Sequence, residues 1–155
     1  EPYIMKTGAR IRPLQEPTKK MSKSDENQNA FISLKDDADT ILRKFRRAVT
    51  DSEARVYYGE GKDGINNLMS IYSAVTGKSF DEIQQEFAGR GYGDFKAAVG
   101  EAVAQTLLPI QQRFDELMKD KAQLDLYMKQ GAEKASAVAQ RTLDKVMKKM
   151  GFVLV

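Results

Sequence analysis

From residue 36 onward, apolar side chains recur every three or four positions, which is the spacing of one face of an α-helix. Residues that cap helices stand before these stretches, and glycines stand after them. The pattern predicts a first helix behind Asp36 and Asp37, and a second helix that ends at Gly77. The segment Ser79-Phe80-Asp81-Glu82 has the form of a capping box and predicts a short third helix.

Two longer helices are predicted in the second half of the chain. The fourth begins behind Asp94 and is kinked at Pro109, because proline removes an intrahelical hydrogen-bond donor. The fifth runs from about residue 124 to 150, is interrupted or bent near Gly131, and ends at Gly151. The residues expected to face inward are Phe95, Val99, Ala102, Val103, Ile110, Phe114, Leu117, Ala135, Val138, Ala139, Leu143, Val146, Met147 and Met150.

The leader, residues 1–34, follows no helical pattern. Prolines, Gly8 and the polar run 18–29 break it up, and only 9–11 and 30–32 look like short strands. A segment of this size cannot bury a core of its own, so it is expected to be the edge of a larger fold or a long functional loop. The expected fold class is mainly α, with a helical domain behind the leader.

The 155-residue chain contains no cysteine and no histidine. Disulfides, zinc sites built on Cys or His, haem ligation through His, Ser-His-Asp triads and Cys-His dyads are therefore excluded within it. No apolar run approaches the ~20 residues that cross a bilayer, so a cytoplasmic location is expected. The sequence begins Glu1-Pro2-Tyr3 without an initiator Met, which suggests a fragment.

Two glycine-rich stretches resemble phosphate-binding loops. Residues 59–64 match G-x-G-x-x-G and precede a helix, but another capped helix follows where a dinucleotide site needs a second parallel strand. Residues 89–93 lack the Lys-Ser/Thr ending of a P-loop. Both stretches are interpreted as turns between helices.

The stretch from Pro17 to Asp25 carries more information about function. It is rich in Lys and Ser, and Met21 is its only large apolar residue. Ammonium groups on such a loop can each meet a different phosphate of a triphosphate, and hydroxyls supply further donors. On composition alone, a solvated basic linker is the better explanation.

The order of the residues, however, favours a phosphate-binding loop over a basic linker. Lys20-Met21-Ser22-Lys23-Ser24 is the KMSKS signature of class I aminoacyl-tRNA synthetases, without a mismatch. The sequence on both sides of it resembles the bacterial-type tryptophanyl-tRNA synthetases over essentially the whole chain. Two departures stand out, because Arg12-Pro13 replaces a small or apolar pair and Asp63 stands where proline is common. The matching segments are 8–11, 14–19, 48–52, 64–68, 71–73, 91–93, 109–111 and 131–135.

This resemblance implies an enzyme that activates tryptophan with ATP and transfers it to tRNA(Trp). It also implies a Rossmann-like catalytic domain followed by a helical, anticodon-binding domain. Nothing in the sequence resembles the family's HIGH-like motif, so a C-terminal portion is expected, and it should be inactive alone. Residues 1–34 would then end the catalytic domain, with the KMSKS loop at 20–24, and residues 35–155 would form the helical domain. The full-length enzyme is expected to be a homodimer.

Residue roles follow from the same resemblance. Lys20 and Lys23 are the expected catalytic residues, which would hold the ATP phosphates and stabilise the departing pyrophosphate. The Met21 backbone and Ile11 would lie against adenine, although Ile11 fits a plain strand position equally well. Mg²⁺ would arrive with ATP, since no cluster of carboxylates lies near the loop. The expected ATP-binding set is Ile11, Lys20, Met21, Ser22, Lys23 and Ser24.

The net charge is only +3, but two helical stretches concentrate positive charge. Such clusters either neutralise RNA phosphates or simply face solvent. Tyr57 and Tyr92 fit stacking on an unpaired base as well as packing, so no anticodon residue is assigned. Two other functions remain open: a stand-alone tRNA- or nucleotide-binding module, and the matching part of a tyrosyl-type synthetase. The clusters are Arg43, Lys44, Arg46 and Arg47, and Lys134, Arg141, Lys145, Lys148 and Lys149.

Overall fold

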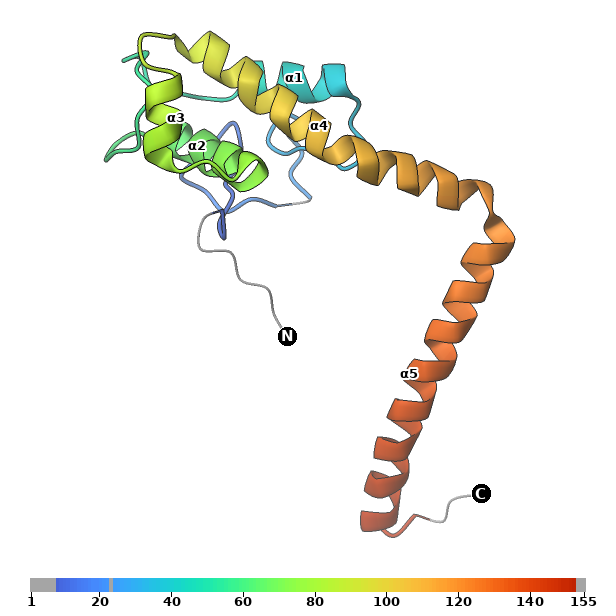
Figure 1. The fold of residues 1–155 in the computed structure, drawn as a ribbon. Helices are drawn as coiled ribbons and strands as arrows, with labels where there is room; N and C mark the ends of the chain where they lie inside the picture. The colour runs from blue at the N-terminus through green and yellow to red at the C-terminus, as the bar shows by residue number, and fades with distance from the viewer. Residues whose placement is uncertain (1–7, 23, 153–155) are drawn as a thin grey trace. The chain divides into compact units, whose positions relative to one another are not determined.

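The computed structural model describes residues 8–22 and 24–152, and five helices account for most of this length (Figure 1). The mainly α fold class is therefore confirmed. Residues 9–11 and 30–32, which look strand-like in the sequence, do not form strands, and the described residues contain none. The helices are α1 (Ala38–Arg46), α2 (Asp63–Thr76), α3 (Phe80–Glu86), α4 (Tyr92–Lys119) and α5 (Lys121–Lys149).

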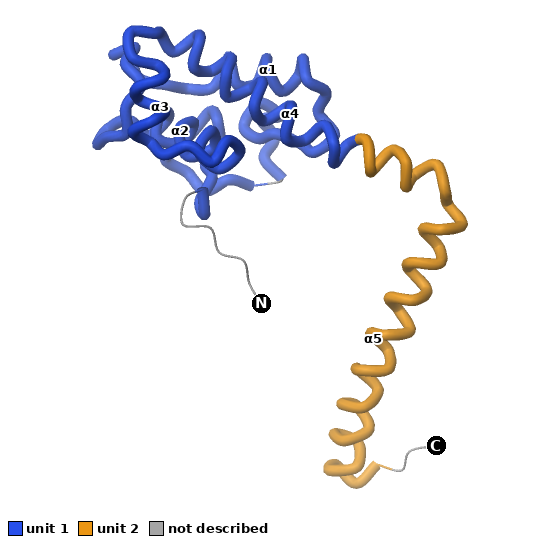
Figure 2. Tube along the Cα trace, in the orientation of Figure 1, with its two compact units in different colours: residues 1–111 blue, residues 112–155 orange. Residues whose placement is uncertain are grey.

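The chain divides into two compact units, residues 1–111 and 112–155, and the division falls inside α4 (Figure 2). The leader belongs to the first unit and contributes to its core. Leu14 and Ala30 are buried there, and the Leu14 N–H donates to the Ala30 carbonyl at 2.8 Å. The resemblance implies a functional boundary after residue 34; this boundary does not coincide with the division into compact units, and it stays a prediction.

The helix ends follow the capping residues of the sequence. Asp37 caps α1 by accepting a hydrogen bond from the Thr40 N–H at 2.7 Å. Gly77 ends α2 with φ +75°, a left-handed conformation that glycine adopts without the strain of a Cβ atom. Ser79 and Glu82 form the reciprocal capping box that opens α3. These three predictions are confirmed.

The core of the first unit lies between the leader, the first three helices and the beginning of α4. Tyr72, Phe87 and Phe95 pack edge to face at its centre, with ring centroids 4.9–6.0 Å apart. The close approach of α2 to the preceding segment requires Gly64, because a Cβ there would lie 2.1 Å from the Val49 carbonyl oxygen. The largest fully buried side chains are Phe45, Phe95, Ile41, Ile65, Leu68, Met69, Ile83 and Val99.

The long helices differ from the prediction at particular positions. Helix α4 begins at Tyr92, before Asp94, because the Gly91 carbonyl already accepts the Phe95 N–H at 3.3 Å. As predicted, it continues past Pro109, and it ends at Lys119. Helix α5 is continuous through Gly131, so an interruption there is wrong, whereas the alternative of a bend stays a prediction. Glycine lowers helix stability by only about 1 kcal/mol and leaves the hydrogen-bond ladder intact.

The apolar stripe along the end of α4 and along α5 does not face inward as predicted. Ile110 is 50% exposed, Phe114 is 42% exposed, and α5 contains no buried residue. Periodicity identifies an apolar face but does not specify what covers it. Within the described residues, no helix is long and apolar enough to cross a membrane.

Candidate functional site

The described residues of the KMSKS signature lie in a stretch of turns, in which backbone hydrogen bonds join residues three positions apart. The Lys19 N–H donates to the Glu16 carbonyl at 2.9 Å, and the Asp25 N–H donates to the Ser22 carbonyl at 3.3 Å. The Ser22 and Ser24 hydroxyls are exposed and lie 3.0 Å apart. Because neither serine is buried, both hydroxyls are accessible to a ligand. Lys23 lies outside the described residues.

A surface pocket of about 480 Å³ brings three of the predicted ATP-binding residues together, although Ile11 stands well before the KMSKS signature that supplies Lys20 and Met21. Ile11 and Met21 are half-buried, whereas Lys20 is exposed. The lining also contains Arg10 and Arg12, which were not predicted as site residues. The only sequence signal for either was that Arg12-Pro13 departs from the family pattern. The pocket is lined by Ala9, Arg10, Ile11, Arg12, Lys20 and Met21.

Helix α2 holds one wall of this pocket through a buried amide. Asn67 accepts the Arg12 N–H at 2.8 Å through Oδ1, and its Nδ2 donates to the Arg12 carbonyl at 2.9 Å. The Arg12 guanidinium in turn donates to the Lys19 carbonyl at 3.2 Å. This chain of contacts connects a rigid helix to the residue immediately before the KMSKS signature.

A second polar cluster surrounds Lys62, whose side chain is 4% exposed. Its ammonium group donates to Asp51 at 3.3 Å, to Glu53 at 2.9 Å and to the Tyr92 hydroxyl at 2.9 Å. It also lies 4.2 Å from the centre of the Tyr57 ring. Nothing in the sequence pattern indicates this cluster except that Lys62 lies in a glycine-rich turn.

Electrostatics in the Lys62 cluster favour the ion pairs. Burial alone lowers the pKa of Lys62, but its hydrogen bonds to Tyr92, Glu53 and Asp51 outweigh that effect and raise the pKa above its ordinary value. Burial raises the pKa of Asp51, yet hydrogen bonds from Tyr92, the Glu53 N–H and Lys62 lower it overall. The cluster therefore stays charged at neutral pH, and it ties the segment 51–57 to the beginnings of α2 and α4.

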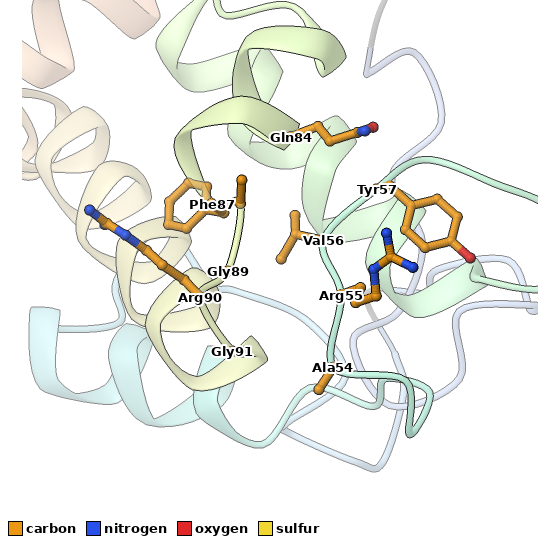
Figure 3. A pocket seen from close by; sticks show the side chains of 10 residues that line it. Ala54, Arg55, Val56, Tyr57, Gln84, Phe87, Gly89, Arg90 and Gly91 are labelled. Atoms are coloured by element: carbon orange, nitrogen blue, oxygen red, sulfur yellow. The ribbon is translucent and has the colours of Figure 1, made fainter.

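Beside this cluster lies a second surface pocket, of about 590 Å³ (Figure 3). One wall is the segment 54–57, and the other is formed by the end of α3 and the loop that leads to α4. Arg55 and Tyr57 stand on the first wall and Arg90 on the second, with Val56 between them in the view of Figure 3. The lining residues are Ala54, Arg55, Val56, Tyr57, Gln84, Phe87, Ala88, Gly89, Arg90 and Gly91.

The two basic stretches differ in how much of their charge is accessible. Lys44 is buried and donates to Asp36 at 2.6 Å and to the Phe31 carbonyl at 3.1 Å, so it is not available to RNA. Arg43, Arg46 and Arg47 are exposed on or next to α1. On α5, the five basic residues of the second cluster are all exposed. Among residues 8–22 and 24–152, no group of three acidic side chains could hold a metal ion.

Comparison with known proteins assigns the chain to a family. The model of the family "tRNA synthetases class I (W and Y)" matches residues 1–108. The chain belongs to this family. The match includes the KMSKS signature and the whole pocket built from Ile11, Lys20 and Met21.

Similar family members are tryptophan–tRNA ligases. The ligase of Clostridium tetani is 49% identical over 99% of this chain and 46% of its own length. The ligase of Clostridium acetobutylicum is 48% identical over the same shares. The crystal structure of tryptophanyl-tRNA synthetase from Mycoplasma pneumoniae matches with a TM-score of 0.82 and 29% identity, over 96% of this chain and 45% of that one. The resemblance to tryptophanyl-tRNA synthetases is confirmed, and the chain spans less than half the length of these relatives.

Proposed function

We propose that the chain forms the C-terminal, KMSKS-bearing part of a tryptophan–tRNA ligase. The observation that carries the proposal is the pocket that joins Lys20 and Met21 of the KMSKS signature to Ile11. Curated relatives that match this chain at 46–49% identity are tryptophan–tRNA ligases, which favours tryptophan over tyrosine as substrate. The ligase activates tryptophan with ATP and then transfers it to tRNA(Trp).

In this proposal Lys20 and Lys23 hold the triphosphate and stabilise the pyrophosphate as it leaves. Charge grows on the leaving group during the reaction, so fixed ammonium groups stabilise the transition state more than the ground state. Ile11 and the Met21 backbone bound the adenine, and the Ser22 and Ser24 hydroxyls donate to the nucleotide. Mg²⁺ enters with ATP as part of the substrate complex.

The remaining parts of the proposal concern the whole enzyme. The helical region binds the anticodon of tRNA(Trp), and the tryptophan pocket lies in the part of the ligase that this chain lacks. The full-length ligase works as a cytoplasmic homodimer. The exposed arginines of α1 and the basic face of α5 support an RNA-binding role, because such charges neutralise phosphates.

Tryptophan-dependent exchange of pyrophosphate into ATP tests the proposal. The full-length protein that contains this chain should catalyse the exchange with tryptophan and not with tyrosine. Residues 1–155 alone should show no exchange above a variant in which Lys20 and Lys23 are both alanine, because the two substrates cannot be brought together. Exchange by the isolated chain, or tyrosine dependence of the full-length protein, would contradict the proposal.

A further inference from the structure

Asn67 is a buried polar side chain of α2 that has no part in the reaction proposed above. Its exposed fraction is 5%, and the two residues that follow it, Leu68 and Met69, are almost completely buried in the core. An amide is tolerated in such surroundings when its polar atoms are paired. Both polar atoms of Asn67 bond to a single residue, Arg12, which lies 55 positions away in the sequence.

The Asn67 amide pairs both main-chain groups of Arg12. Its Oδ1 accepts the Arg12 N–H at 2.8 Å, and its Nδ2 donates to the Arg12 carbonyl at 2.9 Å. A residue in an antiparallel sheet is held in the same way, by two hydrogen bonds to the residue opposite. A side chain of α2 thus takes the place of a neighbouring strand at this point. Its removal would leave one donor and one acceptor of the main chain without these partners.

The main chain beyond Arg12 is fixed separately. Pro13 has no N–H, and it restricts the residue before it to an extended conformation. The Leu14 N–H donates to the Ala30 carbonyl at 2.8 Å, and the Leu14 carbonyl accepts the Val49 N–H at 2.8 Å. These bonds hold the chain after Pro13, whereas the hydrogen bonds from α2 hold it at Arg12.

The residue before Arg12 is the one expected to contact adenine. Ile11 is half-buried, and it lines the pocket of about 480 Å³ together with Lys20 and Met21. Arg12 lines this pocket and also a smaller cavity of about 230 Å³. Because two cavities border this stretch of chain, packing alone does not fix it. The position of the Ile11 wall therefore depends on the hydrogen bonds that hold Arg12.

We propose that Asn67 is a positioning residue for the adenine of ATP. It does not line the pocket around Ile11, and it acts through the main chain of Arg12. The inference rests on the proposed function, because its ligand is the ATP of that reaction. It goes further by giving a residue of the helical region, outside the KMSKS signature, a role in binding the base. A wall that contacts the base equally in the ground state and the transition state lowers the KM for ATP and leaves kcat unchanged.

The neighbouring Asn66 offers a matched control. Its Oδ1 accepts the Gly59 N–H at 3.0 Å, and its Nδ2 donates to the Gly59 carbonyl at 2.6 Å. Gly59 does not line the pocket around Ile11. The two asparagines therefore make the same pair of hydrogen bonds from the same helix, but those of Asn66 hold a segment away from the nucleotide pocket.

Exchange of pyrophosphate into ATP by the full-length ligase tests the role of Asn67. Asn67→Ala should raise the KM for ATP by about 3- to 10-fold and change kcat and the KM for tryptophan by less than about twofold. Asn66→Ala should leave all three constants within about twofold of the wild type. A fall in kcat with an unchanged KM for ATP, or equal effects of the two substitutions, would overturn the proposal.

Two inhibitors that compete with ATP separate the base from the phosphates. Adenosine carries the base without phosphates, and tripolyphosphate carries phosphates without the base. In the Asn67→Ala variant, the inhibition constant of adenosine should rise by about 3- to 10-fold, and that of tripolyphosphate should change by less than about twofold. The reverse pattern would show that Asn67 acts on the phosphate-binding lysines, and it would overturn the proposal.

Asn67→Ser covers the case in which the Asn67→Ala variant does not fold. Its hydroxyl keeps one polar group at this position, so the KM for ATP should rise less, by about 2- to 5-fold, with the same difference between the two inhibitors. A wild-type KM for ATP in the folded Asn67→Ser variant would contradict the proposal.

Equilibrium dialysis of ATP, which needs no catalysis, separates this inference from the proposed function. If the full-length protein exchanges pyrophosphate with tryptophan and the Asn67→Ala variant has the wild-type KM for ATP, the positioning role is wrong and the ligase assignment stands. If exchange is absent but the Asn67→Ala variant binds ATP more weakly than the Asn66→Ala variant, the positioning role stands and the ligase assignment is wrong.

Discussion

At the residue scale, neighbouring lysines in the KMSKS region differ in their surroundings. Lys19 forms an exposed ion pair with Glu16 at 2.9 Å, and both side chains are more than half exposed. Lys20, the next residue, lies in the pocket with Ile11 and Met21. The two lysines have almost the same position in sequence, so they allow a direct comparison between a surface charge and a charge in the site.

In the full-length ligase, Lys20→Ala and Lys23→Ala should each slow adenylate formation by about 10²–10³-fold, because each removes a donor aimed at developing charge. Lys19→Ala is the control and should change the rate by less than about tenfold, as expected for a screened surface pair. Pre-steady-state measurement of adenylate formation provides the comparison. Equally small effects at all three positions would show that the loop is a basic linker.

Arg12 should act on nucleotide binding rather than on the chemical step. Its guanidinium donates to the Lys19 carbonyl and lines the same pocket as Lys20. Arg12→Met should raise the KM for ATP by about 3- to 10-fold and change kcat by less than about twofold, because the lost contact is made equally in ground and transition states.

Exchange rates measured over a range of ATP concentrations would separate the two constants. Arg12→Lys, which keeps the charge but not the planar fork, should lie between Arg12→Met and the wild type. A fall in kcat as large as that of Lys20→Ala would instead place Arg12 among the residues that stabilise the transition state.

At the scale of elements, the Lys62 cluster connects three parts of the first unit. It joins the segment 51–57 to the start of α2 and, through Tyr92, to the start of α4. Breaking a buried ion pair is costly because it leaves a charge without its partner. Glu53 is 43% exposed, however, so water compensates for part of the loss on that side.

Lys62→Met should weaken the local structure of residues 51–58 by about 2 kcal/mol, which corresponds to about 30-fold faster amide exchange there. Hydrogen–deuterium exchange of the full-length protein at pH 7 measures the effect. Lys78→Met breaks a more exposed pair with Glu86 and should accelerate exchange by less than about fivefold. Equal effects of the two substitutions would contradict a special role for Lys62.

The effect of Lys62→Met should depend on pH in a defined direction. The pKa values of Asp51 and Glu53 are lowered by their hydrogen bonds. The two charged carboxylates therefore contribute fully to the stability of the folded state above the ordinary carboxyl pKa of about 4. That stabilisation is lost as the pH falls through the lowered values. Because the pKa of Lys62 is raised, its ammonium group stays charged and contributes fully to the stability of the folded state at neutral pH.

The difference in unfolding midpoint between wild type and Lys62→Met should therefore be full at pH 7 and should shrink as the pH falls below about 4. Chemical unfolding followed at a series of pH values would measure it. A difference that stays constant down to pH 3 would mean that packing of the Lys62 stem, rather than its charge, provides the stabilisation.

At the scale of the whole molecule, the two compact units differ in what holds them together. The first unit has a buried core, whereas α5 contains no buried residue in the part of the chain that the structure describes. An isolated helix is only marginally stable in water, since most helix stability in proteins comes from packing of the apolar face. The stripe at Val138, Leu143 and Val146 is exposed and has no such packing.

When residues 1–155 are produced alone, amides in α5 should therefore exchange at least about 100-fold faster than amides in the buried face of α2. In the full-length ligase, the same α5 amides should be more protected than in the isolated chain. Hydrogen–deuterium exchange of both proteins would make the comparison. Equal protection of α5 and α2 in the isolated chain would contradict this view of the second unit.

The sequence by itself determined the features that depend on neighbours in the chain. The Asp37 cap, the Ser79–Glu82 capping box and the left-handed Gly77 all involve residues within four positions of each other, so local stereochemistry specifies them. The KMSKS signature likewise identified a class I aminoacyl-tRNA synthetase, and the contiguous segments around it identified the family.

Only the tertiary structure decided which side chains meet across long distances in the sequence. It buries Lys44 against Asp36, although Lys44 has the same sequence environment as its exposed basic neighbours. It brings Arg55 and Arg90 into the lining of one pocket, and among the described residues it buries none of α5. Periodicity fixes the direction of a side chain relative to its own helix, whereas its partner depends on how separate elements pack.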